Sequence, residues 1–298
     1  MQEESMRAQS GQRPVFRFAP SPNGRMHLGH ALSAILNHDM AAEVGGSFLL
    51  RIENIDFSRC TPEYEAAIYD DLRWLGLRWD HSVRRQSEHL GAYAAVLDGL
   101  VENGLVYPSF MTRGEVKAVM GKYEAAGGIW PRDPDGSPHY PDQDCRRSQA
   151  ERKELLGRGV RHAWRLDMEK AVAVVRQPLT WRETGKGAER RVEADPSVWG
   201  DVVLSRSDAP SSYHLSVVVD DASQGITHVV RGMDLFHATS LHRLLQELLG
   251  LDEPTYHHHR LIKGEDGRKL SKSNGSTSLS DLRQAGVSPA QIRRRIGL

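Results

Sequence analysis

The chain has 298 residues, of which 39% are apolar and 26% charged, a balance typical of a globular protein and too apolar for extended disorder. Lys and Arg number 39, as do Asp and Glu, so the zero net charge neither indicates nor excludes a nucleic-acid partner. No apolar run approaches the roughly 20 residues needed to cross a bilayer, and two cysteines, Cys60 and Cys145, argue against a disulfide scaffold and favour a reducing cytoplasm.

The first hundred residues have the pattern of an α/β fold. Val15 to Phe18 predicts a buried strand, which a Pro- and Gly-rich turn follows. Apolar residues at three- and four-residue spacing from Leu28 to Met40 predict a helix, and Ser47 to Ile52 predicts the next strand. Thr61 and Pro62 are typical of a helix start. Continuous apolar strands that alternate with helices favour a parallel sheet.

Farther along, residues 107–194 are punctuated by Gly and Pro, and we expect an insertion without a long periodic helix. Strand patterns return at residues 215–219 and 226–230. Ala238 to Leu249 predicts an amphipathic helix that Gly250 ends. Residues 279–298 predict one or two short helices around Ser288-Pro289.

A first constellation of chemical groups is His27-Leu28-Gly29-His30, at the expected start of a helix. Helix N-termini attract phosphate, and two histidines three residues apart face the same side. Gly29 between them would let a nucleotide approach the backbone. Taken alone, the string also fits two surface histidines on a helix.

A second constellation is Lys269-Leu270-Ser271-Lys272-Ser273, a segment flanked by glycines. Two lysines and two hydroxyls in a Gly-flanked loop suit closure over a triphosphate, where they could neutralise departing pyrophosphate. Taken alone, this segment also fits a solvated loop.

Together, the two constellations resemble the paired signature sequences of class I aminoacyl-tRNA synthetases. The resemblance runs from about residue 15 to residue 273, and four further segments look like the glutamyl branch of that class: residues 17–24, 50–56, 217–221 and 230–235. It implies an α/β fold with a Rossmann-like, doubly wound parallel sheet, split by an inserted subdomain and without an anticodon-binding domain. The expected parts are a loose tail (1–13), the first half of the nucleotide-binding catalytic fold (14–106), an acceptor-type insertion (107–194), the second half (195–256), and the lysine-loop region with short C-terminal helices (257–298).

The resemblance also implies which residues bind the substrates. Arg17 and Arg231 can hold carboxylates, with Arg231 reading the side-chain carboxylate, while Glu53 would hold the ammonium group and Tyr213 would offer a hydroxyl and a wall. The expected glutamate site comprises Arg17, Ala19, Ser21, Glu53, Tyr213 and Arg231. The expected ATP site comprises His27, Gly29, His30 and Lys272, with His27, His30, Lys269 and Lys272 as the catalytic residues and Mg²⁺ carried by ATP.

Length decides the expected acceptor, because 25 residues follow Ser273, too few for an anticodon-binding region. The chain therefore resembles the truncated glutamyl-Q tRNA(Asp) synthetases. That family activates L-glutamate without tRNA and transfers it to the queuosine base in the anticodon of tRNA(Asp). We expect a monomeric cytoplasmic ligase with no membrane association. Three alternatives stay open: a truncated synthetase that charges a tRNA acceptor end, a non-catalytic RNA-binding paralogue, and transfer to a carrier protein or small amine.

The sequence departs from the family at a metal site. Family members commonly bind zinc in the insertion through a Cys-x-Cys pair, a Tyr and a further Cys, whereas Ser109 and Met111 replace the first pair here. With Tyr140 and Cys145 they make a poor tetrahedral zinc site. We predict no zinc, and an insertion held by packing of Trp130, Tyr123 and their neighbours.

The run His257-His258-His259 is a second candidate for a metal-binding cluster. Successive residues of a strand point to opposite faces, so the three cannot chelate as a unit there. His258 matches a family histidine that precedes the lysine loop. Cys60 is expected to be a partly buried spectator.

Overall fold

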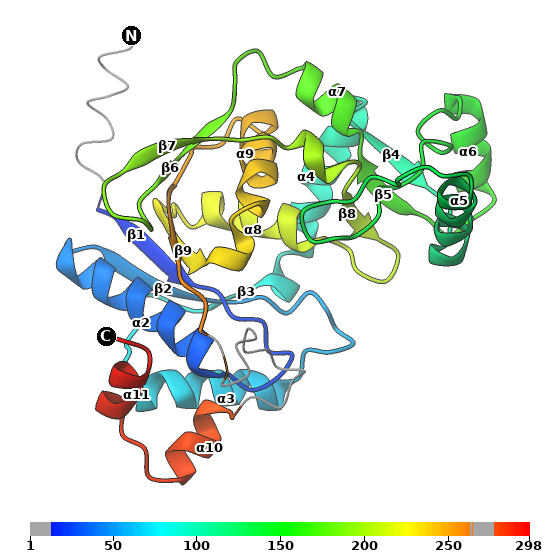
Figure 1. Cartoon of the computed structure of the whole chain (residues 1–298). Helices are drawn as coiled ribbons and strands as arrows, with labels where there is room; N and C mark the ends of the chain where they lie inside the picture. Colours follow the sequence, from blue (N-terminus) through cyan, green and yellow to red (C-terminus); the bar gives the residue numbers. More distant parts are fainter. Residues whose placement is uncertain (1–12, 263, 265–276) are drawn as a thin grey trace.

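A seven-stranded sheet forms the centre of the molecule in the computed structural model, which describes residues 13–262, 264 and 277–298 (Figure 1). Its strands stand in the order β3-β2-β1-β9-β10-β6-β7, and all neighbours pair in parallel except β6 with β7. The strands are β1 (Val15–Phe18), β2 (Ser47–Ile52), β3 (Arg84–Arg85), β6 (Thr180–Glu183), β7 (Arg190–Glu193), β9 (His228–Gly232) and β10 (Thr255–His259). From the centre, β2 and β3 follow β1 outward on one side, and β10 follows β9 outward on the other, with β6 and β7, which precede β9 in the chain, beyond β10. This arrangement confirms the expected doubly wound fold.

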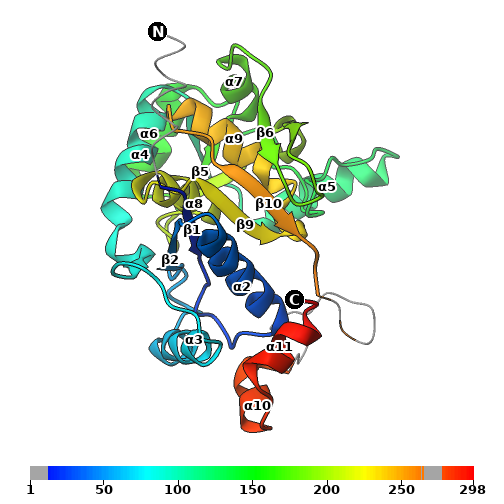
Figure 2. The same cartoon turned by 90° about the vertical axis from the view of Figure 1, so that its left-hand side faces the viewer.

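Helices cover both faces of this sheet (Figures 1 and 2). On one face lie α2 (Leu28–Glu43), which packs on β1, β2 and β9, and α3 (Pro62–Trp74). On the other face lie α4 (Leu90–Glu102), α8 (Tyr213–Ser223) and α9 (Ala238–Leu248). Thr61 caps α3 through Oγ1, which accepts from the Tyr64 N–H at 3.3 Å, as the sequence predicted.

The strand expected at residues 215–219 is wrong, because this segment lies inside α8. Every residue from Leu215 to Asp221 is buried, since α8 packs against α4, α9 and β8. A helix buried all round has no polar stripe, so its apolar run cannot be told from a buried strand by periodicity.

The expectation of no long helix in the insertion is also wrong. Two of the helices that form there are α5 (Arg113–Ala125), of 13 residues, and α6 (Gln149–Gly157), of 9 residues. Each begins with a capping box, Thr112 with Glu115 and Ser148 with Glu151. Neither helix contains a buried residue, so the sequence shows no apolar face to indicate it.

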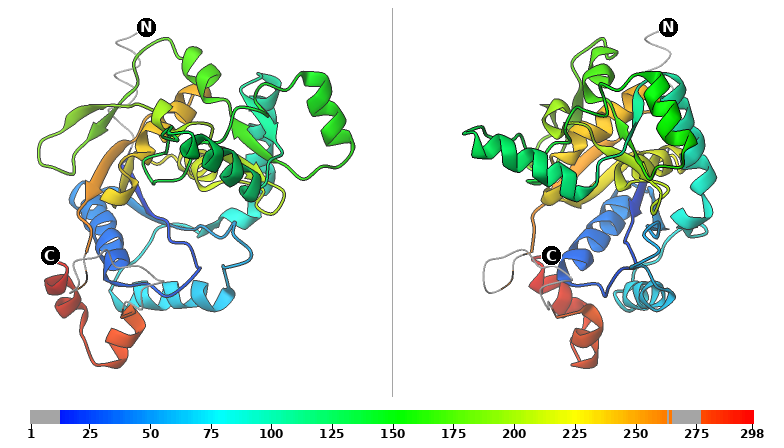
Figure 3. Two further views of the ribbon diagram at one scale, coloured as in Figure 1. Left: turned by 45° about the vertical axis from the view of Figure 1, so that its right-hand side comes forward. Right: turned by 90° about the vertical axis from the view of Figure 1, so that its right-hand side faces the viewer.

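A smaller antiparallel sheet belongs mostly to the insertion. It pairs β4 (Val106–Ser109), β5 (Ala163–Leu166) and β8 (Val203–Arg206), with α7 (Met168–Ala173) following β5. Figure 3 shows α5 and α6 at the opposite end of the molecule from the C-terminal helices. Sheet pairing crosses the expected boundary at residue 194, because β6 and β7 join the large sheet and β8 joins the small one.

The C-terminal helices are α10 (Leu279–Gln284) and α11 (Pro289–Arg295), and they pack near α3 and α2 (Figure 2). Ser288 caps α11, and Pro289 occupies its first turn, which confirms the break expected between two short helices. Arg293 donates to Asp39 on α2 at 2.6 Å. In the described ranges, no helix is long and apolar enough to cross a membrane.

Asp144 ties the insertion together at the segment where the family's cysteine pair would lie. The side chain is fully buried, and its Oδ2 accepts from the backbone N–H groups of Phe110 (2.6 Å) and Met111 (3.3 Å). Oδ2 also accepts from the Tyr140 hydroxyl, and Oδ1 accepts from Arg147 Nε at 2.7 Å. The Asp144 carboxylate therefore holds together the backbone at residues 110–111, the Tyr140 side chain and the Arg147 side chain.

Aromatic packing adds to this anchor. The rings of Tyr123 and Trp130 meet edge to face with centroids 5.4 Å apart, as the sequence analysis expected. The Arg165 guanidinium lies over the Tyr140 ring at 3.9 Å from its centroid. Ring contacts and the hydrogen bonds of Asp144 thus link segments of the insertion, although Tyr123 itself is 51% exposed.

We predict that Asp144→Asn destabilises the protein by about 1–3 kcal/mol, because the amide turns a donor toward buried N–H and O–H groups. Urea unfolding followed by intrinsic fluorescence measures this. The matched control is Asp142→Asn, because Asp142 pairs with Arg146 at an exposed position. Equal stability of the two variants would contradict the role given to Asp144.

Candidate active site

A cavity of about 590 Å³ opens at the carboxyl ends of β1 and β9, where the order of the sheet reverses. Open α/β sheets bind ligands at such switch points. All nine described residues of the expected glutamate and ATP sites line this cavity: Arg17, Ala19, Ser21, His27, Gly29, His30, Glu53, Tyr213 and Arg231. The expected catalytic residues Lys269 and Lys272 lie outside the described residues.

The two histidines form the start of α2. His27 is the N-cap, and its Nδ1 accepts from the Gly29 N–H at 3.1 Å, while His30 Nδ1 accepts from the His27 N–H at 3.2 Å. In each neutral ring the hydrogen therefore resides on Nε2, which can donate to an anion. A Cβ on Gly29 would lie 3.0 Å from the His27 ring, so a larger residue here would require this ring to shift.

The turn after β1 is fixed against the end of β2. The Glu53 N–H donates to the Pro20 carbonyl at 3.0 Å, and the Thr61 N–H donates to the Pro22 carbonyl at 3.1 Å. Ser21 in the same turn has its Oγ 3.6 Å from Cys60 Sγ. These contacts place the backbone around Ala19 and Ser21 at the rim of the cavity.

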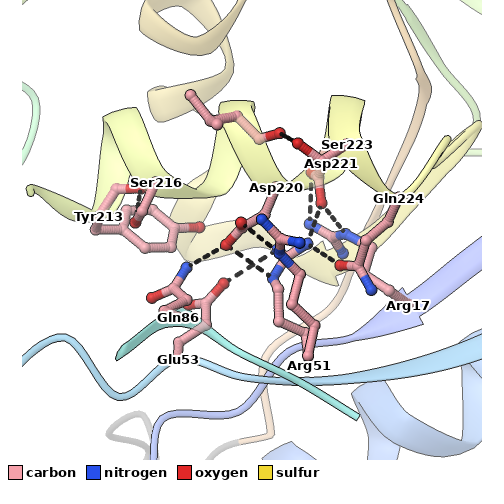
Figure 4. Close-up of polar contacts among 12 residues, drawn as sticks. Arg17, Arg51, Glu53, Gln86, Tyr213, Ser216, Asp220, Asp221, Ser223 and Gln224 are labelled. Atoms are coloured by element: carbon pink, nitrogen blue, oxygen red, sulfur yellow. Dashed lines mark hydrogen bonds and ion pairs between the residues drawn. The ribbon is translucent and has the colours of Figure 1, made fainter. Parts of the chain in front are cut away.

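A buried network of arginines and carboxylates lies beneath the cavity (Figure 4). Asp221, on α8, accepts from Arg17 Nε at 2.9 Å and from Arg51 Nη1 at 2.7 Å. Arg51 Nη2 also donates to Glu53 Oε1 at 3.2 Å. Although burial acts to raise it, the two arginines hold the pKa of Asp221 below its ordinary value. Burial has the larger effect on Glu53 and raises its pKa in spite of Arg51 and Arg17.

Asp220, the preceding residue of α8, extends this network toward β3 and α4. Its carboxylate accepts from Arg84 Nε at 2.8 Å, from Gln86 Nε2 at 2.9 Å and from the Tyr93 hydroxyl at 2.9 Å. Arg51 Nε lies 3.7 Å from Asp220 Oδ2. The three arginines of the network thus face three carboxylates, which removes the cost of an uncompensated buried charge.

Arg231, at the end of β9, has different surroundings. It is 5% exposed and donates to His258 Nε2 (3.1 Å) and to His242 Nδ1 (3.0 Å). Burial lowers the pKa of His258 to about 4 and that of His242 well below its ordinary value, so both rings are neutral acceptors. Among the described residues, no carboxylate contacts this guanidinium.

The site contains functional groups that the sequence analysis missed, namely Arg51, Asp220, Asp221, His242 and Glu183, the buried partner of His258. Asp220 and Asp221 directly follow the apolar run 215–219, which indicates that they are buried. Buried carboxylates need cationic partners, so these two residues could have predicted the arginine network. The sequence did not indicate His242. It lies on the polar side of α9, whose pattern predicts one exposed face, whereas the structure buries both faces of this helix.

The three histidines of β10 do not act as a unit, and the expected strand is confirmed. His258 bonds Glu183, His257 bonds Thr184 Oγ1 at 3.0 Å, and His259 lines the cavity. Within the part of the chain that the structure describes, no group of three His, Cys, Asp or Glu residues could hold a metal ion.

Chemically, the cavity offers two adjoining regions. The histidine pair and the N-terminus of α2 suit a phosphate chain, whereas Arg17, Glu53 and Arg231 suit a small ligand that carries both carboxylates and an ammonium group. A second cavity of about 430 Å³ shares Ser21, Glu53 and Tyr213 with the first and continues toward β8.

Comparisons with known proteins agree with this geometry. Residues 15–298 match the family model for the catalytic domain of class I tRNA synthetases (E and Q). A glutamyl-Q tRNA(Asp) synthetase of Rhodobacter capsulatus is 47% identical over 95% of this chain and is covered completely. A glutamate–tRNA ligase of Synechococcus sp. is 34% identical over 95% of this chain, which spans 56% of that relative. A solved glutamate tRNA ligase of Elizabethkingia meningosepticum, in complex with its amino acid, superposes with a TM-score of 0.73 at 28% identity, over 89% of this chain and 53% of that one. The chain belongs to the class I tRNA synthetases of the glutamate and glutamine group.

Proposed function

We propose that this ligase activates L-glutamate with ATP, without tRNA, and transfers the glutamyl group to the queuosine base in the anticodon of tRNA(Asp). The observation that carries the choice of amino acid is the buried Arg231 guanidinium, which lines the cavity without a carboxylate among its described partners. The acceptor is supported by the Rhodobacter capsulatus relative of that name, which this chain covers completely.

Glutamate fits the charges at the base of the cavity. Arg231 would receive the side-chain carboxylate, and Glu53 would hold the ammonium group. Arg17 keeps one edge on Asp221 and would direct its remaining N–H groups at the reacting carboxylate. Tyr213, whose ring packs on His242 with centroids 5.7 Å apart, would form a wall. Ala19 and Ser21 would contact the ligand from the turn.

ATP would lie across the histidine pair, with Nε2–H of His27 and His30 donating to its phosphates. Gly29 would allow close approach of the phosphate chain to the backbone. Lys269 and Lys272 would neutralise the leaving pyrophosphate, and Mg²⁺ would accompany ATP. A glutamate carboxylate oxygen attacks the α-phosphorus while the bond to pyrophosphate breaks, so the protein contributes mainly position and charge.

We further propose that the protein acts as a monomer in the cytoplasm. Both cysteines are free thiols, as a reducing compartment requires. Size-exclusion chromatography with light scattering would test the monomeric state.

Zinc does not fit the four family positions here. Ser109 donates to the Ala163 carbonyl at 2.9 Å, and Tyr140 donates to Asp144. Cys145 donates to Asp167 at 3.5 Å, and burial raises the pKa of its thiol to about 11. Two of the four positions are a serine hydroxyl and a methionine thioether, Ser109 and Met111, which are poor zinc ligands.

We therefore predict that the purified protein contains far less than one zinc ion per chain by elemental mass spectrometry. Incubation with a strong chelator should leave the thermal midpoint unchanged, because hydrogen bonds rather than metal bonds hold the insertion. Stoichiometric zinc, or a fall in the midpoint after chelation, would contradict the prediction.

The proposed reaction is tested in two steps. Glutamate-dependent ATP–pyrophosphate exchange should occur without RNA, since activation needs no tRNA. Labelled glutamate should then appear on queuosine-containing tRNA(Asp), and neither on tRNA(Asp) that lacks queuosine nor on tRNA(Glu).

Each other outcome of these assays would favour one of the three alternative functions. Labelling of tRNA(Glu) would favour a truncated synthetase that charges a tRNA acceptor end; two 34% identical relatives are named glutamate–tRNA ligase. Exchange with neither RNA labelled would favour a carrier protein or small amine as acceptor. Absence of exchange in folded protein would contradict the proposed activity and favour a non-catalytic RNA-binding protein.

A further inference from the structure

The guanidinium of Arg231 is held in one orientation by four hydrogen bonds. Nε donates to His258 Nε2 at 3.1 Å, and Nη1 donates to His242 Nδ1 at 3.0 Å. Nη2 donates to Thr239 Oγ1 at 2.7 Å and to the Leu235 carbonyl at 3.2 Å. A guanidinium has five N–H groups, so these bonds leave one N–H of Nη1 for a ligand.

The two arginines of the cavity are neutralised in different ways. Arg17 has a carboxylate in direct contact, because Asp221 meets both its Nε (2.9 Å) and its Nη2 (3.3 Å). Arg231 has only neutral groups in contact among the described residues. A buried cation without a counter-charge is costly, so its compensation must come from farther away.

A buried carboxylate, that of Glu183, lies one imidazole ring beyond Arg231. His258 stands directly beside Arg231 in the parallel register of β10 and β9, and Glu183 stands on the neighbouring strand β6, opposite Tyr256. Glu183 Oε2 lies 2.5 Å from His258 Nδ1. Since His258 Nε2 accepts from Arg231, the ring hydrogen is on Nδ1, and it is donated to Glu183.

The Glu183 carboxylate is saturated by N–H donors and is 1% exposed. Oε1 accepts from the backbone N–H groups of His258 (3.0 Å) and Gly185 (2.9 Å). Oε2 accepts from Trp181 Nε1 at 3.2 Å in addition to the imidazole. A Cβ at Gly185 would lie 2.3 Å from the His258 carbonyl, so glycine permits this close approach.

The charge states follow from these contacts. Burial lowers the pKa of His258 to about 4. Burial acts to raise the pKa of Glu183, but the hydrogen bonds from His258 and Gly185 outweigh it and hold that pKa at about 2. At neutral pH the carboxylate is therefore ionised, and the imidazole is neutral in a single tautomer.

We propose that Glu183 and His258 are positioning residues for amino-acid recognition, in which Glu183 fixes the tautomer of His258 and thereby the orientation of the Arg231 guanidinium. The proposal rests on the proposed function, in which Arg231 reads the side-chain carboxylate of glutamate. Glu183 supplies a counter-charge to Arg231 from behind His258. The position in front of the Arg231 guanidinium is thereby left for the carboxylate of the ligand. Partners of this kind, behind a functional histidine, orient it and set its basicity.

Glu183→Gln tests this arrangement with almost no change in shape. If the amide oxygen faces the backbone N–H groups, the NH₂ group meets the Trp181 N–H and His258 Nδ1. The imidazole can relieve that clash only by moving its hydrogen to Nε2, which then opposes the Nε–H of Arg231. If the amide is turned round, its NH₂ meets two backbone donors. In either orientation two of the four N–H donors around residue 183 lose their acceptor, because an amide has one oxygen where the carboxylate has two.

We expect Glu183→Gln to raise KM for glutamate in ATP–pyrophosphate exchange by about 10- to 100-fold, with KM for ATP unchanged. The preference for glutamate over glutamine, as a ratio of kcat/KM values, should fall as well, because the neutral substrate gains less from an oriented cation. Loss of structure alone would lower kcat for both substrates without this selectivity.

A second variant and a control accompany it. His258→Asn keeps an NH₂ group near the Nδ1 position to donate to Glu183 but removes the acceptor of Arg231, so it should also raise KM for glutamate selectively. Glu253→Gln is the matched control, because Glu253 accepts from the Arg182 N–H on the same strand at 2.9 Å and does not contact Arg231. It should behave as the wild type.

The possible outcomes distinguish a failure of the proposed function from a failure of the inference about Glu183 and His258. Wild-type protein without glutamate-dependent exchange would overturn the proposed function and this inference with it. Active wild type, with Glu183→Gln and His258→Asn both retaining the wild-type KM for glutamate, would overturn the inference alone. If Glu183→Gln does not fold, by circular dichroism and thermal melting, His258→Asn decides by the same criterion.

Discussion

The Asp221 carboxylate joins two arginines from adjacent strands, Arg17 on β1 and Arg51 on β2, to helix α8. Two guanidinium groups side by side in a buried site repel each other, and only an anion between them makes the arrangement stable. Asp220, the next residue on the same helix, does the same for Arg51 and Arg84. The carboxyl edge of the sheet, where the cavity lies, therefore depends on one short acidic segment of one helix.

The two arginines of the cavity have different surroundings, and in the proposed function this difference would give selectivity. Arg17 belongs to the protein's own ion network, because Asp221 contacts its guanidinium directly. Arg231 is held by neutral acceptors, and the Glu183 carboxylate lies behind one of them, His258. In the proposed function, a ligand carboxylate would meet an oriented cation that has no carboxylate in direct contact among the described residues, which would favour glutamate over an uncharged analogue.

Sequence reasoning found the parts of this site that lie close together along the chain. The His27 pair and the turn before it were predictable because one helix start fixes them, and the sheet was predictable because its strands are continuous apolar runs. The helix at 215–219 was not, since complete burial removes its periodicity. The link from Glu183 to Arg231 joins residues of three strands, and only the register of β6, β10 and β9 brings them together.

The central claim is that this cavity binds glutamate as its adenylate with the side-chain carboxylate on Arg231. A crystal structure with a non-hydrolysable glutamyl-adenylate analogue tests it most directly. The account predicts the side-chain carboxylate against Nη1 of Arg231, the ammonium group against Glu53 and the adenosine phosphate mimic above the His27 pair. A side-chain carboxylate bound at Arg17, or an analogue bound outside this cavity, would contradict it.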